Sequence, residues 1–550
     1  MGSTKRSWQE IVVEKRQAQA DYIARLVQED GGHRQESPMG GLAFIKGHEI
    51  GGSLCRKDYR CEELIMSSIQ RACEIHKTTN CLTEVCFDEA LLSSRALDEH
   101  LNQEHKLVGP LHGVPTTLKD QFNIKGLDTT LGYVGRALAP AEDDAALVKM
   151  LRALGAVILA KSNLPQSIMW CETDNPLWGL TTNPFDSNFT PGGSTGGEGV
   201  LVSCGASALG FGTDIGGSIR IPSHMMGIYG LKPSSSRLPY EGVPVSTEGQ
   251  EHVPSSVGPM ASTLETIHLA MKSLIDLKPW EFDSRCSPIS WRSDMYDQVL
   301  SRPLVFGVVF DDGVARPHPP VTRVLQSAIK ALEAAGHSVI EWNTDFHKEC
   351  IELMDEYYTA DGGEDVRSAV TCGGEPFIEH VEKLINRGQP ISVYEYWQLN
   401  RRKWALQNAY LKKWQSTRTP DGRLVDAIIM PTMPHTAVPH KSCRWVGYTK
   451  VWNVLDYTAL TIPAGHVVQE DLEAAWNFKP RGEIDEWCLG LWQQGRRRMA
   501  ELALPVGLQI VGRKLEEEKV LGVGKVVDDI LQSAKRKSCK DGAHAGRTIT

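Results

Sequence analysis

The sequence lacks the features that mark membrane, secreted and nucleic-acid-binding proteins. Its longest weakly polar stretch, LVSCGASALGFG, is too short to cross a bilayer and is interrupted by glycine. The N-terminus carries no secretory signal, and Arg6 stands where N-myristoylation requires Ser or Thr. The formal net charge of -9 leaves no basic excess to hold a phosphate backbone. These absences predict a cytoplasmic protein that binds neither membrane nor nucleic acid and takes a small-molecule partner.

Paired cysteines and metal-binding motifs are also missing. The 13 cysteines include no C-x-x-C pair, and the sequence has no H-E-x-x-H motif. An odd number of cysteines without regular spacing is not typical of a disulfide framework. We therefore expect reduced thiols, no metal and no cofactor.

The chain does have a long alternation of short apolar strands and helices. Helical spacing of apolar residues occupies 5–30 and 59–78, with a glycine-rich segment between them, 31–53, that predicts a loop. Residues 145–162 have the pattern of a helix running into a strand, and 304–343 that of a β-α-β unit. This alternation predicts an α/β fold with a central twisted, mixed but mostly parallel sheet, flanked by helices on both faces.

The same patterns divide the chain into one large domain and two flanking segments. We expect a helix and loop extension over 1–58 and a single large domain over 59–532. The charged, Trp-containing stretch at about 466–500 is typical of a surface insertion, and 533–550 of a polar tail. The amphipathic N-terminal helix would also suit a homodimer interface.

Two glycine-rich loops each contain a serine that is a candidate nucleophile. Ser194, in GGSTGG, matches the G-x-S-x-G pattern of a nucleophile elbow, but no apolar strand leads into it. Ser218, in GTDIGGS, follows a small-residue strand and precedes a predicted helix, whose first backbone N–H groups are free. Such donors, here from residues 215–218, can hold an oxyanion.

A serine hydroxyl needs a base, and neither loop contains histidine. His112 and His224 have the contexts of turn and helix residues, which leaves Lys119, at the end of an apolar strand, as the remaining candidate. Burial would lower the pKa of this lysine toward neutral pH. Cys171 is another possible nucleophile, although its setting is more typical of a buried packing thiol.

Six segments resemble the amidase signature family, in order and over nearly the whole chain: GPLHGVPTTLKD, NLPQSIMWCETDNPLWGLTTNP, PGGSTGGEG, GTDIGGSIRIPSHMMGIYGLKPS, DAIIMPTMP and PVGLQIVGR. Within that family the chain is most similar to the fungal acetamidase or general amidase branch. The resemblance implies a Ser-Ser-Lys triad. Ser218 would be the acyl-forming nucleophile, Ser194 the bridging serine held by a cis peptide, and Lys119 the base.

The resemblance also implies roles for the neighbours of the triad. The remaining site residues are an oxyanion loop (Ile215, Gly216 and Gly217), two residues that brace it (Asp214 and Arg220), two that line an acyl pocket (Ile168 and Met169), and Thr195. At Thr195 many relatives carry serine, and threonine keeps the hydroxyl.

The implied activity is cofactor-free hydrolysis of a carboxylic acid amide to the acid and ammonia or an amine. Three alternatives stay open at this point. They are the A subunit of a glutaminyl-tRNA-type amidotransferase, a biosynthetic amidase of a secondary-metabolite pathway, and a non-catalytic binding protein on the same fold.

Overall fold

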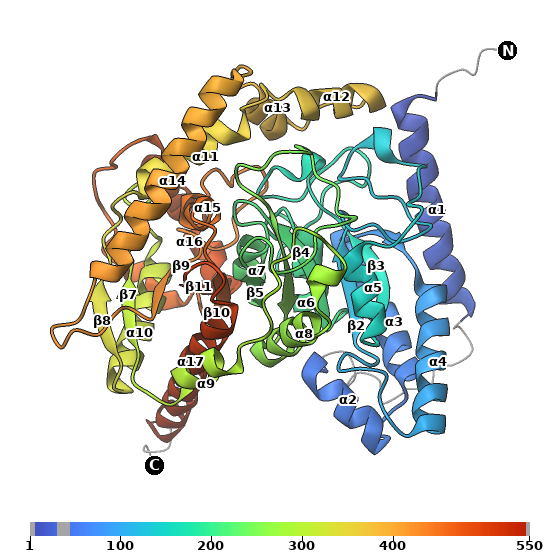
Figure 1. The fold of residues 1–550 in the computed structure, drawn as a ribbon, viewed down its shortest axis with the longest axis horizontal. Coiled ribbons are helices and arrows are strands. Elements are labelled where there is room, and N and C mark those ends of the chain that lie inside the picture. Colours follow the sequence, from blue (N-terminus) through green and yellow to red (C-terminus); the bar gives the residue numbers. More distant parts are fainter. Residues whose placement is uncertain (1–5, 30–44, 546–550) are drawn as a thin grey trace.

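A single large β-sheet runs through the centre of the molecule. The computed structural model describes residues 6–29 and 45–545. The sheet has eleven strands in the order β1-β3-β2-β4-β6-β5-β10-β11-β9-β7-β8. Figure 1 shows α1 and α4 beyond one end of this order, and β7 and β8 at the other.

The strands are β1 (Leu82–Val85), β2 (Pro115–Lys119), β3 (Val157–Ser162), β4 (Leu209–Asp214), β5 (Tyr229–Lys232), β6 (Ser256–Ala261), β7 (Val305–Val308), β8 (Ser338–Glu341), β9 (Ala427–Pro431), β10 (Ala459–His466) and β11 (Pro505–Val511). The helices are α1 (Trp8–Glu29), α2 (Gly47–Arg56), α3 (Cys61–Thr79), α4 (Phe87–Glu104), α5 (Ala146–Ala153), α6 (Gly196–Ser203), α7 (Arg220–Met226), α8 (Leu264–Asp276), α9 (Ser293–Leu300), α10 (Pro319–Ala334), α11 (His347–Tyr358), α12 (Glu364–Gly373), α13 (Glu379–Ile385), α14 (Val393–Ser416), α15 (Gly447–Val454), α16 (Glu483–Glu501) and α17 (Glu517–Ala545).

The sheet is mixed, as expected, but the prediction of a mostly parallel sheet is wrong. Only the pairings of β2 with β3 and β4, and of β7 with β8 and β9, are parallel, while the other six are antiparallel. The parallel pairs β2-β3 and β7-β8 come from local β-α-β units, which the sequence pattern shows. The antiparallel pairs include β5 with β10, which are more than two hundred residues apart, and local alternation carries no signal of such pairings.

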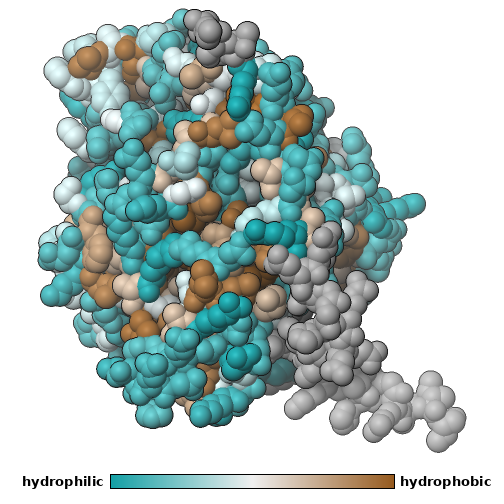
Figure 2. All heavy atoms as spheres, turned by 90° about the vertical axis from the view of Figure 1, so that its right-hand side faces the viewer, coloured by the Kyte–Doolittle hydropathy of each residue, from teal (hydrophilic) through white to brown (hydrophobic). Residues whose placement is uncertain are grey.

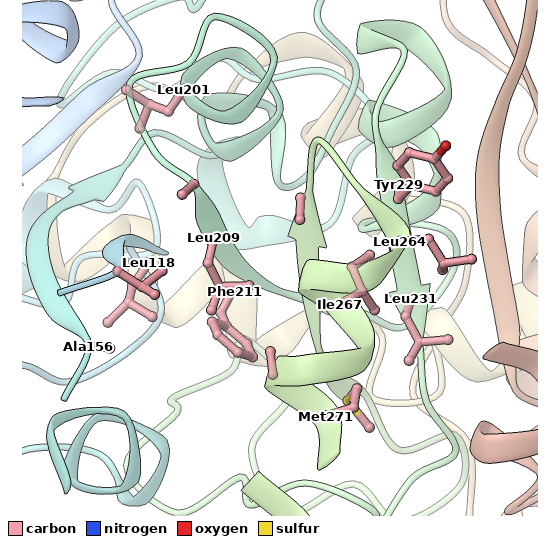
Figure 3. Packing of buried hydrophobic residues seen from close by; sticks show 14 of the residues in the cluster. Leu118, Ala156, Leu201, Leu209, Phe211, Tyr229, Leu231, Leu264, Ile267 and Met271 are labelled. Atoms are coloured by element: carbon pink, nitrogen blue, oxygen red, sulfur yellow. The ribbon is translucent and has the colours of Figure 1, made fainter. Parts of the chain in front are cut away.

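Helices cover both faces of the sheet, as predicted. A Cβ at Gly210 or Gly212 of β4 would meet Glu198 of α6 or Thr195 just before it, so this face of the strand lies close under α6. The alternate residues Leu209 and Phe211 point the other way and pack in one core cluster with side chains of α8 (Figure 3). The small residues on one face of β4 and the large apolar residues on the other thus determine how close α6 and α8 lie to the strand.

Several local predictions are confirmed. The helices expected over 5–30 and 59–78 are α1 and α3, the helix and strand expected over 145–162 are α5 and β3, and α10 connects the parallel strands β7 and β8.

The glycine-rich segment 31–53 is only partly a loop. Residues 30–44 lie outside the described part of the chain, but α2 begins at Gly47, where the sequence predicts a loop. A Cβ at Gly47 would lie 2.6 Å from Thr266 Cγ2, so this glycine serves close packing of α2 on α8. Ile50 and Leu54 bury the apolar face of the helix.

The outer segments of the chain are partly built into the core. Within 466–500, Trp492 of α16 is buried in a cluster with residues such as Ile221, and Cys488 of the same helix is buried in a second cluster. Helix α17 continues through Ala545, and 546–550 lie outside the described residues. The boundaries at 58 and 532 stay predictions.

Hydrophilic residues predominate on the side of the molecule that carries α1 and α4, where apolar residues appear in separate groups (Figure 2). Among the described residues, no helix combines the length and apolar character that a membrane crossing requires.

Candidate active site

Lys119 is the last residue of β2 and is completely buried. Its Nζ lies 2.6 Å from Ser194 Oγ and 3.0 Å from Thr213 Oγ1. Strands β2 and β4 are parallel neighbours and end at the same edge of the sheet, so Lys119 and the loop after Asp214 lie together. The sequence prediction of a buried lysine at a strand end is confirmed.

Burial sets the protonation of Lys119. Loss of solvation lowers its pKa to about 7, although the Asp214 carboxylate opposes the shift. A large fraction of this side chain is therefore an uncharged amine at neutral pH, with a lone pair available for a proton.

A short chain of hydrogen bonds orients that amine. The Thr213 hydroxyl donates to Gln121 Oε1 at 2.7 Å, and Gln121 Nε2 in turn donates to the Pro244 carbonyl at 2.8 Å. Because the Thr213 proton is committed to Gln121, Thr213 Oγ1 can only accept from Lys119. An N–H of Lys119 then points at Thr213, and in the neutral amine either the second N–H or the lone pair can face Ser194 Oγ.

Ser194 lies in the loop before α6 and is 1% exposed. The peptide bond between Gly193 and Ser194 is cis. The next amide, of Thr195, donates to the Ser218 carbonyl at 3.2 Å and thereby joins the two serine loops. The buried Thr195 hydroxyl lies 3.5 Å from the carbonyl of Thr213.

Ser218 is partly exposed, unlike Lys119 and Ser194, and precedes the first turn of α7. Within the described chain, the amides of Ile215, Gly216 and Ser218 make no hydrogen bond and are free to hold an oxyanion. The Gly217 amide is not free, because it donates to Asp214 Oδ1 at 2.8 Å. The expectation that Gly217 supplies an oxyanion donor is therefore wrong, and the carboxylate that braces the loop has taken that donor.

Asp214 and Arg220 form a fully buried ion pair that holds the loop. Arg220 Nη2 lies 2.9 Å from Asp214 Oδ1, and Nε lies 3.0 Å from Oδ2. Burial would raise the pKa of Asp214, but the Arg220 guanidinium holds it well below its ordinary value. Arg220 also donates to the Thr449 carbonyl and to Asn453 Oδ1, so the loop is fixed to α15. The predicted bracing by Asp214 and Arg220 is confirmed as geometry.

Two cavities meet at Ser218. The smaller has a volume of about 180 Å³ and the larger about 340 Å³, and Ile168, Met169, Ile215 and Ser218 line both. Ser167 and Ile168 both adopt left-handed backbone conformations, with φ of 67° and 61°, which are rare for residues other than glycine.

No histidine lines either cavity in the described structure. His224 is buried, with both ring nitrogens beside the backbone of His435 and Gly507. Cys171 lines the smaller cavity, and its Sγ lies 3.7 Å from the Cys443 carbonyl. Lys119 is thus the basic group that geometry connects to a serine. The part of the chain that is described contains no group of three or more His, Cys, Asp or Glu able to hold a metal ion.

A family model described as Amidase matches residues 63–521. The chain belongs to the amidase family. The matched segment runs from α3 into α17 and includes every site residue named above.

Fungal proteins with amidase names cover most of this chain. Amidase 1 of Gibberella moniliformis is 50% identical over 527 residues, which is 96% of this chain and 100% of that protein. Acetamidase of Emericella nidulans is 38% identical over 474 residues, 85% of this chain and 86% of that protein. The resemblance to fungal acetamidases and amidases is confirmed, and this amidase is an enzyme that hydrolyses amides.

Among solved structures, fatty acid amide hydrolase matches with a TM-score of 0.83 and 28% identity, covering 96% of this chain and 91% of that chain. A bacterial aryl acylamidase of the amidase signature family has a TM-score of 0.69 at 21% identity and supports the fold alone. This amidase therefore has the amidase-signature fold over nearly its whole length.

Sequence reasoning missed several residues of the amidase site. Thr213 and Gln121 orient Lys119, and both stand in the quoted segments or directly beside them. Their proximity to Lys119 and Asp214 in the sequence was an available signal. Thr449 and Asn453 stand more than two hundred residues beyond the loop that they hold, and no local pattern marks them.

Proposed function

We propose that Lys119, Ser194 and Ser218 form a proton relay that hydrolyses a small-molecule amide through an acyl-serine intermediate. The observation that carries the proposal is the 2.6 Å separation of Lys119 Nζ and Ser194 Oγ in a site where the lysine is wholly buried. A neutral amine at this distance accepts the Ser194 proton, and Ser194 in turn accepts the proton of Ser218.

The acylation step then follows. Ser218 Oγ attacks the carbonyl carbon while its proton passes to Ser194 and the Ser194 proton passes to Lys119. The oxyanion accepts hydrogen bonds from the free amides of Ile215, Gly216 and Ser218, donors of a kind worth about 3 kcal/mol each in acyl transfer.

Collapse of the intermediate breaks the C–N bond. Lys119 returns its proton to Ser194, which protonates the leaving nitrogen, because an amide anion is too basic to depart unaided. Water then attacks the acyl-Ser218 ester with the relay reversed, and the products are a carboxylic acid and ammonia or an amine.

The position of Ser194 also indicates which cavity takes the acyl side of the substrate and which takes the leaving-group side. Ser194 lines the larger cavity but not the smaller one, and Gly216 lines the smaller but not the larger, while Ser218 lines both. The group that Ser194 protonates therefore lies toward the larger cavity, and the acyl group occupies the smaller one.

Three single variants test the relay. Ser218→Ala removes the nucleophile and should abolish both turnover and the acyl adduct seen by intact-protein mass spectrometry. Ser194→Ala and Lys119→Ala should lower kcat by at least about 100-fold, in the range expected for general base catalysis. Ser203→Ala, a serine on α6 away from both cavities, is the matched control. Turnover near the wild-type rate in Ser218→Ala would contradict the assignment.

The names of the relatives favour a self-contained amidase over the amidotransferase subunit. Both relatives named above are called amidase or acetamidase. The homodimer and the cytoplasmic location stay predictions.

A further inference from the structure

The smaller cavity carries an excess of positive charge. Its charged lining residues are Arg387, Arg444 and Lys450, against a single carboxylate, Asp355. This excess stands out because the chain as a whole has a formal net charge of -9. The larger cavity has the opposite balance, with Glu248 and Glu251 against Arg285.

The cations differ in whether they already have a partner. Lys450 Nζ lies 2.6 Å from Asp355 Oδ1, so the lysine and the only carboxylate of the lining neutralise each other. Arg387 and Arg444 make no ion pair with any carboxylate in the described chain. Two guanidinium groups of the cavity thus remain available to an anion.

The two arginines mark the outer end of this cavity. Both are exposed, whereas Gly216 and Lys450 are buried in its wall. Arg444 directly follows a segment held by Glu172, whose carboxylate accepts the Lys441 and Cys443 amides at 2.7 and 2.8 Å. Arg444 therefore stands on a fixed backbone at the opening.

The lining of the cavity also has an apolar part. Ile221, Leu384, Val446 and Ile484 belong to it, together with Ser218 and the arginines. The cavity volume of about 180 Å³ is similar to that of cavities that hold one benzene ring. An acyl group that extends from Ser218 toward the exposed arginines of this lining would have its far end beside the cations.

We propose that this amidase acts on amides whose acyl group ends in a carboxylate, that is, on monoamides of dicarboxylic acids, with Arg387 and Arg444 as the carboxylate-binding residues. The guanidinium fork matches a carboxylate with two parallel hydrogen bonds. The inference rests on the proposed acyl-serine function, because it takes the smaller cavity as the acyl side.

A pair of substrates of similar length tests this preference. Glutaramate carries a terminal carboxylate and hexanamide ends in a methyl group, while both present the same primary amide. We expect the wild-type kcat/KM for glutaramate to exceed that for hexanamide by roughly tenfold or more, in line with hydrogen bonds to a charged group. An equal or higher kcat/KM for hexanamide would overturn the inference and leave amide hydrolysis itself intact.

Variants that remove the charge of one arginine test which residues bind the carboxylate. Arg387→Gln and Arg444→Gln should each raise KM for glutaramate several-fold and change kcat/KM for hexanamide much less. The matched control is Arg401→Gln, an exposed arginine of α14 that lines neither cavity. Equal losses on both substrates, or an equal effect of the control, would overturn the assignment of these arginines.

A binding measurement separates this inference from the proposed reaction. Titration calorimetry with the Ser218→Ala variant measures glutaramate binding without turnover. Binding that is tighter than that of hexanamide, and that weakens in Ser218→Ala/Arg444→Gln, supports the carboxylate site even if the relay is wrong. Equal affinity for glutaramate and hexanamide would contradict the proposed carboxylate site, regardless of which amides the enzyme hydrolyses.

Discussion

In the proposed relay a single residue, Lys119, sets how the activity depends on pH. Only its neutral form can take a proton, and burial lowers its pKa to about 7 against the opposing charge of Asp214. We therefore expect kcat/KM to fall about tenfold for each pH unit below that value and to level off above it. Amide hydrolysis measured from about pH 5.5 to about pH 9 checks this, with thermal melts at each pH as the folding control. An ascending limb near the ordinary lysine pKa would show that the amine is solvated.

Thr213 is a second single residue of interest, because it positions the Lys119 amine. Replacement of Thr213 by Val keeps the shape but removes the acceptor that directs one Lys119 N–H. We expect kcat to fall by roughly 10- to 100-fold, because a misplaced base loses most of its advantage. The hydroxyl also stabilises the ammonium form, so its loss should move the ascending limb of the pH profile to lower pH. Thr213→Ser restores the hydroxyl and should recover most of the rate, whereas wild-type kcat in Thr213→Val would refute the role.

At the scale of elements, the loop between β4 and α7 depends on one backbone conformation. Gly217 has φ +131°, and a Cβ there would lie 2.4 Å from Thr449 Oγ1, which donates to the Gly216 carbonyl at 2.6 Å. We expect Gly217→Ala to lower the free energy of unfolding by about 2–4 kcal/mol and kcat by at least about 100-fold, since the oxyanion donors move with the loop.

The control for this substitution is Gly422→Ala. Gly422 also has a positive φ, of 87°, but nothing lies within 4 Å of its Cβ position. Gly422→Ala should lower the free energy of unfolding by about 1 kcal/mol, through its backbone conformation alone, and leave kcat unchanged. Chemical denaturation and steady-state kinetics measure both effects, and equal losses in the two variants would rule out the steric cause.

At the scale of the whole molecule, α1 is attached to the sheet edge by a nearly buried ion triplet. Lys15 Nζ lies 2.5 Å from Glu84 Oε1 and 2.8 Å from Asp128 Oδ2, with all three side chains no more than 14% exposed. Lys15→Met leaves two nearly buried carboxylates without their cation. We therefore expect the free energy of unfolding to fall by about 1–3 kcal/mol, seen as a lower Tm, with kcat unchanged.

The exposed pair of Arg6, which precedes α1, and Glu14 of α1 offers the comparison for Lys15. Their side chains are 59% and 49% exposed, and Arg6→Gln should leave Tm nearly unaltered because solvent already screens the pair. A similar Tm in the Lys15→Met variant and the wild type would mean that α1 contributes little to stability.

The sequence predicts local elements of this amidase better than their long-range arrangement. Periodicity identifies α1, α3 and the β7-α10-β8 unit, because amphipathic spacing is a property of neighbouring residues. Strand direction in the centre of the sheet depends on pairs such as β5 and β10, which only the folded chain brings together. Gly47 belongs to a segment whose pattern predicts a loop, but it begins α2 and serves close packing, a role that becomes visible only when Thr266 is in place.

The same limit applies to the site. Glycine-rich loops make Ser194 and Ser218 candidates, a strand end makes Lys119 one, and the resemblance to the amidase signature family implies the role of each. The loss of the Gly217 amide to Asp214 depends on three-dimensional geometry that spacing does not encode.

The burial of Lys119 has a chemical consequence beyond basicity. An uncharged lysine amine at neutral pH readily forms Schiff bases with aldehydes and carbamates with carbon dioxide. Here the amine is wholly enclosed and Ser218 is the member of the relay that meets solvent. The enclosure that deprotonates the amine thus also keeps small cellular electrophiles away from it.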